Sequence, residues 1–411
     1  MSLQDAATRV VKRLVDAGYT AYFAGGWVRD FLINRTSDDI DIATNAPLNV
    51  VISLFPKTIA LGAAFGIVVV VEEGHPFEVA TFRKDKDYVD GRRPERIETA
   101  TAEEDAERRD FTINGMFYDP IQNQLHDFVG GQKDLRLGIV RAIGDPSRRF
   151  EEDRLRMMRA ARYATRFDFT IEKETLQAIQ RHAHTLLPAV AIERIWQEFK
   201  KIAQYGVLAE GLVLLQKLGL LPTIFPSLQS ISTEEVQRRT SKIPFFPTNT
   251  PLLLAILELF PEYGEKEAVA LAETFKLSNQ DRKLIPFYYH AKQMLLMTES
   301  LQEKLENIEW AKFYAHPMHA LCIDIFLTYF PEEKRRMLKT MHTARIHFLR
   351  QDIERIVLKR PLVTADILMR EGIPSGPKLG LLLQEAERIA VNQHLDSPQQ
   401  VLGILKASVV W

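Results

Sequence analysis

The sequence has almost no cysteine, no long apolar run and almost no net charge. Cys322 is the only cysteine among 411 residues, so no intramolecular disulfide is possible and a reducing compartment, the cytoplasm, is expected. No apolar stretch approaches the roughly 20 residues that span a bilayer, and residues 1–20 predict an amphipathic helix rather than a signal peptide. We therefore expect no membrane partner. The net charge of −1 provides no general attraction to nucleic acid. Any RNA contact must use local basic patches, and no DNA partner is expected.

The apolar pattern changes along the chain. In the first 145 residues or so, β-branched and apolar stretches predict strands at TAYFAGG (20–26), DDIDIAT (38–44) and GIVVVVEE (66–73). The last strand continues into a hairpin whose turn is expected at Gly74-His75-Pro76. The polar segment 84–105 predicts a mobile loop. From about Phe150 onward apolar residues recur at helical spacing and strand signals vanish. The predicted fold class is therefore α+β, with a mixed sheet and flanking helices in an N-terminal head and an all-helical remainder.

Two aspartates interrupt the second predicted strand. Residues i and i+2 of a strand project from the same face, so Asp39 and Asp41 are expected side by side. Two carboxylates this close repel each other unless a cation lies between them, and such pairs hold Mg²⁺ for in-line phosphoryl transfer. Glu78, on the second strand of the hairpin, is the candidate for a third carboxylate. D-x-D tripeptides are also common on surfaces, so the pattern alone leaves a solvated acidic segment open.

A pair of glycines precedes these aspartates. Gly25 and Gly26 follow a predicted strand at the start of a predicted helix, where backbone N–H groups can approach a triphosphate. Arg29 lies one turn into that helix and is placed to meet a phosphate. A salt bridge from Arg29 to Asp30 or to another carboxylate is the structural alternative.

Together these residues resemble the signature of the class II tRNA nucleotidyltransferase and poly(A) polymerase family, in the DNA polymerase β-like superfamily. The family pattern is G-G-x-V-R-D, a spacer and D-x-D-x-x-T, which the sequence matches with Gly25, Gly26, Val28, Arg29, Asp30, Asp39, Asp41 and Thr44. Further stretches resemble family motifs in the same order: EEDAERRDFTINGMFYDP (103–120), DFVGGQKDL (127–135), RFEEDRLRMMRAARYATRF (149–167) and AIERIWQEFKKI (191–202).

The resemblance implies a Mg²⁺-dependent nucleotidyltransferase that takes CTP and ATP. Asp39, Asp41 and Glu78 would be catalytic, with Asp39 and Asp41 as the metal ligands. The expected nucleotide-binding residues are Gly25, Gly26, Arg29, Arg109, Asp110, Asn114, Asp153, Arg156, Arg159 and Arg162. We predict a catalytic head over residues 1–140, a neck with the base-recognition helix over 141–205, a body over 206–330 and an RNA-binding tail over 331–411.

The choice of base follows from the E-D-x-x-R stretch. Asp153 and Arg156 are three residues apart on a predicted helix, hence on one face, where they offer an acceptor beside a fork of donors. Cytosine and adenine both present an exocyclic amine beside a ring-nitrogen acceptor, whereas uracil and guanine present a carbonyl that would leave the carboxylate unpaired. The alternative is an acidic helix N-terminus formed by Glu151, Glu152 and Asp153. The two interpretations are compatible.

Two basic stretches are candidates for RNA contact. Arg159, Arg162 and Arg166 are spaced to form a basic stripe on the same predicted helix. The second stretch, residues 333–350, is as consistent with a solvated helix face as with RNA binding. No aromatic positions for stacking single-stranded bases are apparent in the sequence.

The acceptor is expected to be the 3′ end of tRNA, to which C, C and A would be added. ALGAAFGIVVVV (60–71), FRKDKDYVDGRRPERIE (82–98) and PLVTADILMREGIPSGPKLGLLLQEAERIAVNQHL (361–395) resemble segments of tRNA enzymes rather than of bacterial poly(A) polymerases. Addition of A alone, or of poly(A), remains an alternative. So does an RNA-binding protein with a vestigial site, although the three acidic residues are present. The oligomeric state is left open.

Overall fold

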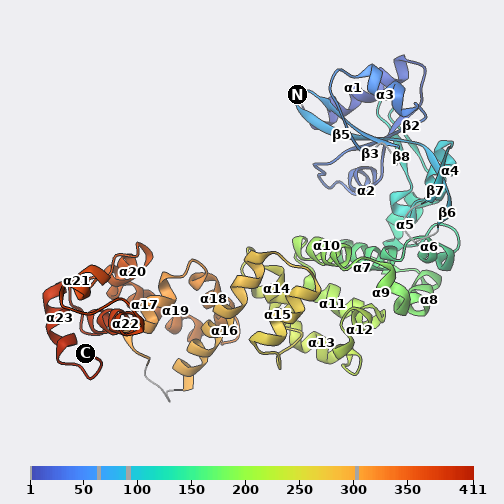
Figure 1. Cartoon of the computed structure of the whole chain (residues 1–411). Helices are drawn as coiled ribbons and strands as arrows, with labels where there is room; N and C mark the ends of the chain where they lie inside the picture. Colours follow the sequence, from blue (N-terminus) through green and yellow to red (C-terminus); the bar gives the residue numbers. More distant parts are fainter. Residues whose placement is uncertain (1, 63–65, 89–93, 301–304) are drawn as a thin grey trace. The chain divides into compact units, whose positions relative to one another are not determined.

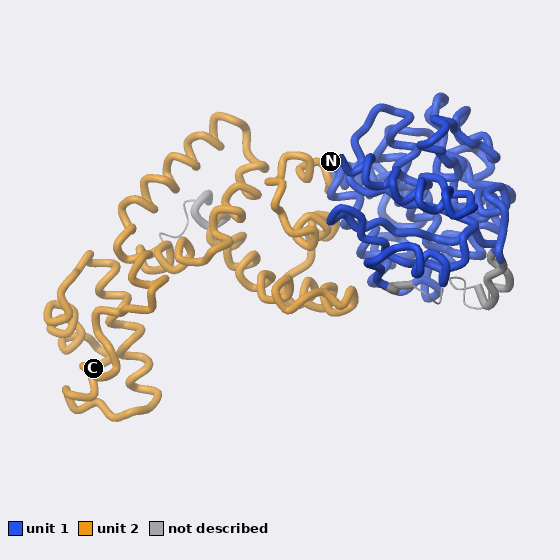
Figure 2. The backbone as a smooth tube through the Cα atoms, turned by 90° about the horizontal axis from the view of Figure 1, so that it is seen from above, with its two compact units in different colours: residues 1–238 blue, residues 239–411 orange. Residues whose placement is uncertain are grey.

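The structure, a computed structural model, describes residues 2–62, 66–88, 94–300 and 305–411. The chain divides into two compact units, residues 1–238 and 239–411 (Figure 2). Their boundary falls in helix α13 (Thr233–Thr240), inside the segment predicted as the body. The division into head, neck, body and tail remains a prediction. Among the described helices, none is long and apolar enough to cross a membrane.

Unit 1 begins with a seven-stranded mixed sheet of strand order β3-β4-β5-β2-β1-β8-β9. The strands are β1 (Ala21–Ala24), β2 (Asp41–Thr44), β3 (Thr58–Gly62), β4 (Ile67–Glu72), β5 (His75–Thr81), β8 (Phe117–Asp119) and β9 (Gln124–His126). Only the β2–β5 pair is parallel within this sheet. Helices α1 (Leu3–Asp16) and α3 (Leu48–Leu54) contact each other and the sheet (Figure 1). Helix α2 (Gly26–Leu32) follows β1 directly.

The predicted β4–β5 hairpin is present, but its turn differs from the prediction. Strand β4 ends at Glu72 and β5 begins at His75, so the turn is Glu73-Gly74, with φ of 51° and 82°. His75 and Pro76 belong to the strand. The turn needs two residues of positive φ, and Gly74 adopts such a backbone without strain. This hairpin places Glu78 on a strand beside β2.

The prediction of a mobile loop over residues 84–105 is wrong for the described residues. Strands β6 (Arg83–Tyr88) and β7 (Pro94–Thr99) form an antiparallel pair, and helix α4 (Ala102–Glu107) follows with a capping box between Thr101 and Glu104. Hydrogen bonds of the main chain hold such a pair without apolar side chains, so polar composition did not exclude it. Residues 89–93 of this segment, and residues 63–65 of the G-x-x-F-G-x-V stretch, lie outside the described residues.

The rest of unit 1 is helical apart from one small parallel pair, β10 (Ile139–Val140) with β11 (Thr170–Ile171). Strand β11 lies beyond residue 150, where no strand was expected. The helices are α5 (Gly131–Leu137), α6 (Pro146–Glu152), α7 (Leu155–Phe167), α8 (Lys173–His182), α9 (Leu186–Ala189), α10 (Ile192–Gln204), α11 (Leu208–Lys217) and α12 (Leu220–Ile224). Short 3-10 turns are η2 (Thr112–Asn114), η3 (Ala183–Thr185) and η4 (Pro226–Leu228). Helix α7 packs against α10 and α11.

Unit 2 is helical throughout its described residues. Its helices are α14 (Leu252–Leu257), α15 (Glu265–Thr274), α16 (Asn279–Ser300), α17 (Asn307–Ala315), α18 (His319–Leu327), α19 (Glu332–Phe348), α20 (Arg350–Val357), α21 (Ala365–Arg370), α22 (Pro377–Asn392) and α23 (Pro398–Lys406), with η5 (Ile243–Phe245) before them. One apolar core lies among α21, α22 and α23. Cys322, on α18, is completely buried, and this burial raises the pKa of its thiol to about 12. The mixed sheet followed by helices confirms the predicted α+β fold class.

Candidate active site

The turn between β1 and α2 is where the backbone comes closest to the acidic residues. Gly25 has φ +68°, a conformation that residues with a Cβ rarely adopt. A Cβ built at Gly25 would lie 3.5 Å from both Asp41 Oδ2 and Arg109 Nη1. The same glycine therefore permits the turn and lies beside the Asp41 carboxylate and the Arg109 guanidinium.

Three predicted carboxylates gather at this turn. Strand β2 begins at Asp41, so Asp39 precedes the strand rather than lying on it, which corrects the predicted start at residue 38. Alternation still holds, because Ile40 is buried while Asp39 is exposed and Asp41 is half-buried. The parallel register aligns Ile42 with Val79, one residue beyond the pair Asp41 and Glu78. Asp39 and Glu78 thus lie near enough to Asp41 for their charges to act on it.

The electrostatics of Asp41 reflect this crowding. Burial and, after it, the negative charges of Asp39 and Glu78 raise the pKa of the Asp41 carboxyl to about 6, while the Arg109 guanidinium opposes the rise. Carboxylates that repel one another in this way gain from a bound cation, so the donor set fits a hard divalent metal.

Among the described residues, no three or more Asp, Glu, His or Cys side chains lie close enough together to hold a metal ion between them. That arrangement is compatible with Mg²⁺, which often takes only one or two carboxylates and completes its octahedral shell with water and substrate phosphate oxygens. Asp39 and Asp41 therefore remain the predicted metal ligands.

A buried chain of hydrogen bonds joins four of the predicted nucleotide-binding residues. Arg29 Nη1 donates to Asn114 Oδ1 (2.6 Å), and Asn114 Nδ2 donates to Asp110 Oδ1 (3.0 Å). Asp110 Oδ2 accepts from Arg159 Nε at 2.7 Å. Arg29 also donates from Nε to Asp30 Oδ1 (2.8 Å), which is the salt bridge left open by the sequence. This chain links α2, η2 and α7.

The charges along this chain hold each other in their ionised forms. Burial by itself would raise the pKa of Asp110, but the Arg159 charge and the hydrogen bonds from Asn114 and Arg159 lower it to about 2. Burial likewise opposes the Arg159 charge, and Asp110 more than compensates, so the pKa of Arg159 is raised. The hydroxyl of Tyr163 accepts from Arg159 Nη2 at 2.9 Å. Asp110 is buried, whereas the Arg159 side chain is 30% exposed, so the ion pair lies at the edge of the buried region and its carboxylate is hydrogen-bonded through both oxygens.

Arg109 lies between this chain and the acidic residues. Its Nε and Nη2 donate to Asp105 Oδ2 at 3.1 and 2.9 Å, and its guanidinium lies 4.7 Å from the centroid of the Phe117 ring. Asp105, which also pairs with Arg108, is almost fully buried. Asp105 was not predicted as a site residue; it lies on α4, whereas Arg109 lies two residues beyond the end of that helix.

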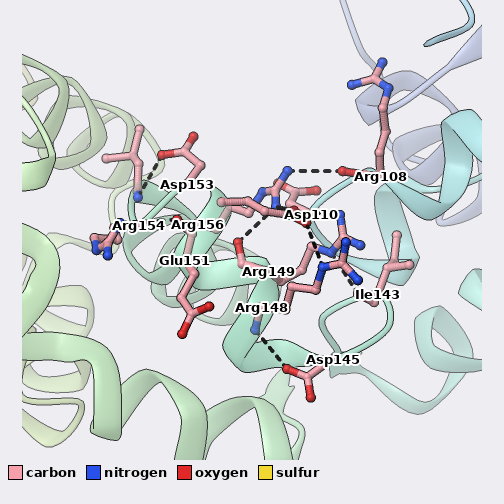
Figure 3. A network of polar contacts seen from close by, with 12 residues as sticks. Arg108, Asp110, Ile143, Asp145, Arg148, Arg149, Glu151, Asp153, Arg154 and Arg156 are labelled. Carbon is pink, nitrogen blue, oxygen red and sulfur yellow. Dashed lines mark hydrogen bonds and ion pairs between the residues drawn. The ribbon is translucent and has the colours of Figure 1, made fainter. Parts of the chain in front are cut away.

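The predicted shared helix of Asp153 and Arg156 is interrupted. Helix α6 ends at Glu152, Asp153 is extended at φ −148°, and α7 begins at Leu155. Asp153, labelled in Figure 3, accepts through Oδ1 the backbone N–H of Leu155, the first residue of α7, at 3.1 Å. A short polar side chain that bonds to the nearby backbone in this way favours a break over a continued helix. The expectation that both side chains lie on one helix face is therefore wrong.

Each of these two residues is held by another partner. Asp153 Oδ2 accepts from Arg194 Nη2 at 3.0 Å. Arg156 donates to Glu152 Oε2 at 2.8 Å. It also donates to the backbone carbonyls of Arg149 (3.0 Å) and Arg108 (3.1 Å) (Figure 3). Glu152 ends α6, so it does not belong to an acidic helix N-terminus as the alternative supposed. Both side chains remain partly accessible.

Each arginine of the predicted basic stripe on α7 is paired with a carboxylate. Arg159 pairs with Asp110, Arg166 Nη2 lies 3.1 Å from Asp30 Oδ2, and Arg162 Nε lies 2.6 Å from Glu198 Oε2. Arg162 is only 4% exposed, which argues against a direct contact with a nucleotide. The expectation of an exposed stripe is wrong because α7 is a packed helix whose arginines are matched by carboxylates from three other elements.

Two of these partners, Arg194 and Glu198, were not predicted from the sequence, whereas Asp30 was named there as a partner of Arg29. A signal for Arg194 and Glu198 existed, since both lie in AIERIWQEFKKI. Their pairing with Asp153 and Arg162, like that of Asp30 with Arg166, joins segments more than thirty residues apart, which no local spacing reveals.

Comparison with known proteins identifies the relatives of this chain. Residues 21–141 match the family described as "Poly A polymerase head domain", and residues 168–231 match "Probable RNA and SrmB- binding site of polymerase A". The chain is 31% identical to the CCA-adding enzyme of Lactobacillus johnsonii over 393 residues, which cover 93% of this chain and 92% of that protein. It is 30% identical to the CCA-adding enzyme of Anoxybacillus flavithermus over 406 residues, covering 96% and 95%. The chain belongs to the CCA-adding enzyme family.

The fold agrees with solved structures of CCA-adding enzymes. The CCA-adding enzyme of Bacillus stearothermophilus in complex with CTP is 25% identical, covers 99% of both chains and has a TM-score of 0.81. The Thermotoga maritima CCA-adding enzyme complexed with tRNA-CCA has a TM-score of 0.67 over 100% of this chain and 96% of that chain, at 21% identity, which shows a shared fold. These comparisons confirm the resemblance to this family of nucleotidyltransferases, which depend in general on a divalent metal.

Proposed function

We propose that this chain adds C, C and then A to the 3′ end of tRNA, without a nucleic-acid template, using CTP and ATP and releasing pyrophosphate. The observation that carries the proposal is the Asp41 carboxylate, which lies beside Gly25 and Arg109 and carries a raised pKa because of burial and two neighbouring carboxylates. Membership of the CCA-adding enzyme family supports tRNA as the acceptor. We place the activity in the cytoplasm, where the buried thiol of Cys322 needs no partner.

The metal in this proposal is Mg²⁺, held by Asp39 and Asp41. When bound, Mg²⁺ lowers the pKa of an attacking hydroxyl and neutralises charge that develops on the transferred phosphoryl group. Glu78, one strand away, adds negative charge that favours retention of the cation. The glycine at position 25 leaves room for a phosphate to approach the backbone, and Arg109 provides positive charge at the same place.

The series of hydrogen bonds that runs from Arg29 through Asn114 and Asp110 to Arg159 positions this site. Arg29 orients Asn114, Asn114 orients Asp110, and Arg159 keeps Asp110 ionised. Ribose and phosphate contacts would then come from Asp110, Asn114 and Arg109. These groups are held in place before the substrate arrives, so little reorganisation is needed during the reaction.

Base selection is assigned to Asp153 and Arg156, although they do not share a helix face. Arg194 holds the Asp153 carboxylate, and Glu152 holds the Arg156 guanidinium. An acceptor and a donor fixed in this way match the amine and ring nitrogen of cytosine or adenine. A uracil or guanine would place its carbonyl oxygen against the Asp153 carboxylate oxygen with no proton between them. Both acceptors would then lack a donor, which disfavours binding of these bases.

The test is extension of three tRNA transcripts that end at the discriminator base, at C and at CC. Each is incubated with Mg²⁺ and CTP, ATP or both, and read at single-nucleotide resolution, with an unstructured oligonucleotide in parallel. Ordered growth to CCA that then stops is the expected result. Addition of one A to the CC-ended transcript alone would restrict the activity to A addition. A long A ladder on any RNA would indicate a poly(A) polymerase instead.

Replacement of Asp41 tests the site itself. We expect Asp41→Ala to abolish extension, because the carboxylate predicted to hold the metal is lost, while tRNA binding survives. Gel-shift binding and extension are measured on the same preparation. Extension at the wild-type rate would rule out the proposed metal ligand, and simultaneous loss of binding and of the thermal unfolding transition would indicate misfolding.

A further inference from the structure

Unit 2 contains a hollow of about 250 Å³ that the proposed active site does not use. Its lining residues come from the end of α14 and the segment after it, from the middle of α16, and from the end of α18 and the segment after it. Six aromatic rings line it: Phe260, Tyr288, Tyr289, Phe326, Tyr329 and Phe330. Its volume lies just below the roughly 300 Å³ at which pockets for drug-sized ligands begin, so it suits one small planar group.

The rings are ordered against each other. Tyr288 stacks on Phe326 with a centroid distance of 5.8 Å, and Tyr289 meets Tyr288 edge to face at 5.7 Å. Phe326 contacts Tyr329 at 6.2 Å. Tyr288 and Phe326 are buried, whereas Tyr329 is 40% exposed. The hollow therefore has a fixed aromatic floor and an accessible side.

One carboxyl group faces these rings. Burial raises the pKa of Glu258, and a hydrogen bond from the Tyr329 hydroxyl and the charge of Lys292 oppose the rise. Burial and the Glu258 charge also raise the pKa of Tyr288. Beyond the hydrogen bond from Tyr329, this carboxyl keeps lone pairs that a ligand donating a hydrogen bond would satisfy, whereas an apolar group in the same place would only add to its desolvation.

One lysine lines the hollow and a second contacts one of its aromatic rings from outside the lining. Lys292 Nζ lies 6.0 Å from the centroid of the Tyr289 ring, and Lys334 Nζ lies 4.7 Å from the centroid of Phe330. Lys334 opens the basic part of α19, which continues through Arg335, Arg336 and Lys339. Glu332 in the same turn pairs with Arg336. Aromatic faces bordered by cations are the combination with which proteins hold bases of single-stranded nucleic acid.

We propose that this hollow binds one nucleobase of the tRNA, stacked on the aromatic rings, with an exocyclic amine of the base donating to Glu258 and the adjoining phosphates near Lys292 and Lys334. Cytosine, adenine and guanine carry such an amine and uracil does not. The proposal rests on the proposed function, because it takes tRNA as the bound RNA. A free nucleotide offers the same chemistry, so the experiment must separate the two sources.

The experiment measures the affinity of the full chain for a tRNA transcript that lacks CCA, by fluorescence anisotropy at fixed salt. Tyr289→Leu is expected to bind about tenfold more weakly, because stacking on one aromatic ring contributes a factor of this order to binding. Lys292→Ala is also expected to bind more weakly, because a positive charge beside the phosphates is lost. Lys283→Ala is the matched control, because Lys283 is an exposed lysine on the same helix outside the hollow. Its affinity should equal that of the wild type.

A scan of transcripts with single abasic positions identifies the base. We expect one abasic position to weaken binding to the wild type and to have no further effect on Tyr289→Leu. Glu258→Gln, which keeps the size of the side chain, should reduce the preference for an amine-bearing base at that position. Free CTP should bind the wild type and Tyr289→Leu equally. A loss confined to free CTP would overturn RNA as the source.

Two controls keep the outcomes distinct. Thermal unfolding of each variant detects loss of folding. If Tyr289→Leu does not fold, the tRNA affinity of Lys292→Ala, which removes no ring, shows whether the hollow contributes to binding. Wild-type extension of tRNA is recorded in parallel. If the wild type extends tRNA but Tyr289→Leu, Lys292→Ala and Glu258→Gln all bind tRNA as the wild type does, the hollow is not a base site. If the wild type does not extend tRNA at all, the proposed function fails first.

Discussion

At the scale of single residues, the backbone of Gly25 matters more than the space around it. A Cβ added at Gly25 would lie 3.5 Å from Asp41 and from Arg109, which are ordinary van der Waals distances, so an added methyl group meets no clash. The cost of a substitution comes from φ +68°, which disfavours any residue with a Cβ by about 1–3 kcal/mol.

Gly25→Ala should therefore change the backbone conformation of the turn rather than cause a steric clash. We expect kcat/KM for CTP to fall by roughly tenfold or more, since small displacements of catalytic groups have effects of this size. Gly18→Ala is the matched control, because Gly18 also has positive φ (+88°) with nothing within 4 Å of its Cβ. It should lose similar stability and keep its activity. Equal activity losses in both variants would show that strain alone is responsible.

Asp153 offers a second test at this scale. We expect Asp153→Ala to raise the incorporation of UTP relative to CTP before it destroys catalysis, because the carboxylate that opposes a carbonyl is gone. The ratio of kcat/KM values for the two nucleotides measures this change. Arg194→Ala is the comparison, since it frees the Asp153 carboxylate without removing it. Unchanged selectivity in Asp153→Ala would exclude its role in base pairing.

The residues of the acidic cluster were predictable, and their supports were not. Asp39, Asp41 and Glu78 follow from the two-residue period of strands and from one recognisable hairpin. Asp153 and Arg156 were misplaced because a spacing of three residues implies one face only within an unbroken helix. Asp153 instead accepts the backbone N–H of Leu155 and starts a new helix.

At the scale of secondary-structure elements, α7 shows how packing changes the meaning of a charge pattern. Its arginines were expected to face RNA, yet Arg159, Arg162 and Arg166 each meet a carboxylate from a different element. Local sequence contains the positive charges but not the partners, which lie 36 to 136 residues away along the chain. The β6–β7 pair was missed for a similar reason, because its hydrogen bonds belong to the main chain.

Helix α19 contains a buried histidine that gives unit 2 a predictable response to pH. His342 is 5% exposed and its Nδ1 lies 2.8 Å from the Tyr314 hydroxyl. Burial, with the positive charges of Arg345 and His319, lowers the pKa of His342 to about 4. Above its ordinary pKa of 6.5 both the folded and the unfolded chain hold it neutral. Below that value only the unfolded chain takes up the proton.

We therefore expect the free energy of unfolding to fall as pH drops from 6.5 towards 4, by up to about 3 kcal/mol from this group. Chemical denaturation at pH 5, 6 and 7 measures the effect. His342→Gln should flatten this dependence, whereas His290→Gln, which alters an exposed histidine on α16, should leave it unchanged. The same slope in both variants would place the dependence elsewhere.

At the scale of the whole molecule, the switch from mixed to helical structure was visible in the sequence, and the order of the strands was not. Apolar periodicity distinguishes strands from helices locally. The neighbours β2 and β5 are parallel and separated in sequence by the β3–β4 segment, so their pairing depends on contacts between distant stretches. The boundary between the two compact units, inside α13, also has no local sequence signal.

Two compact units predict two unfolding transitions. We expect differential scanning calorimetry to resolve them, and Mg²⁺ with CTP to raise the midpoint of the transition that belongs to unit 1, where all predicted nucleotide-binding residues lie. Leu382→Ala, in the α21–α23 core, should reduce the free energy of unfolding of unit 2 by about 2–5 kcal/mol. It should therefore lower only the midpoint of the unit 2 transition. A single transition that moves as a whole with CTP would show that the chain unfolds as one cooperative body.

The buried thiol of Cys322 makes the chain a convenient starting point for optical studies. At neutral pH a thiol with a pKa of about 12 is ionised in only about one molecule in 10⁵, and its side chain is inaccessible to reagents. A cysteine introduced at an exposed position would then be the only group to react with a maleimide dye. Pairs of such dyes would allow movements of the chain during successive nucleotide additions to be followed by energy transfer, without first removing a native cysteine.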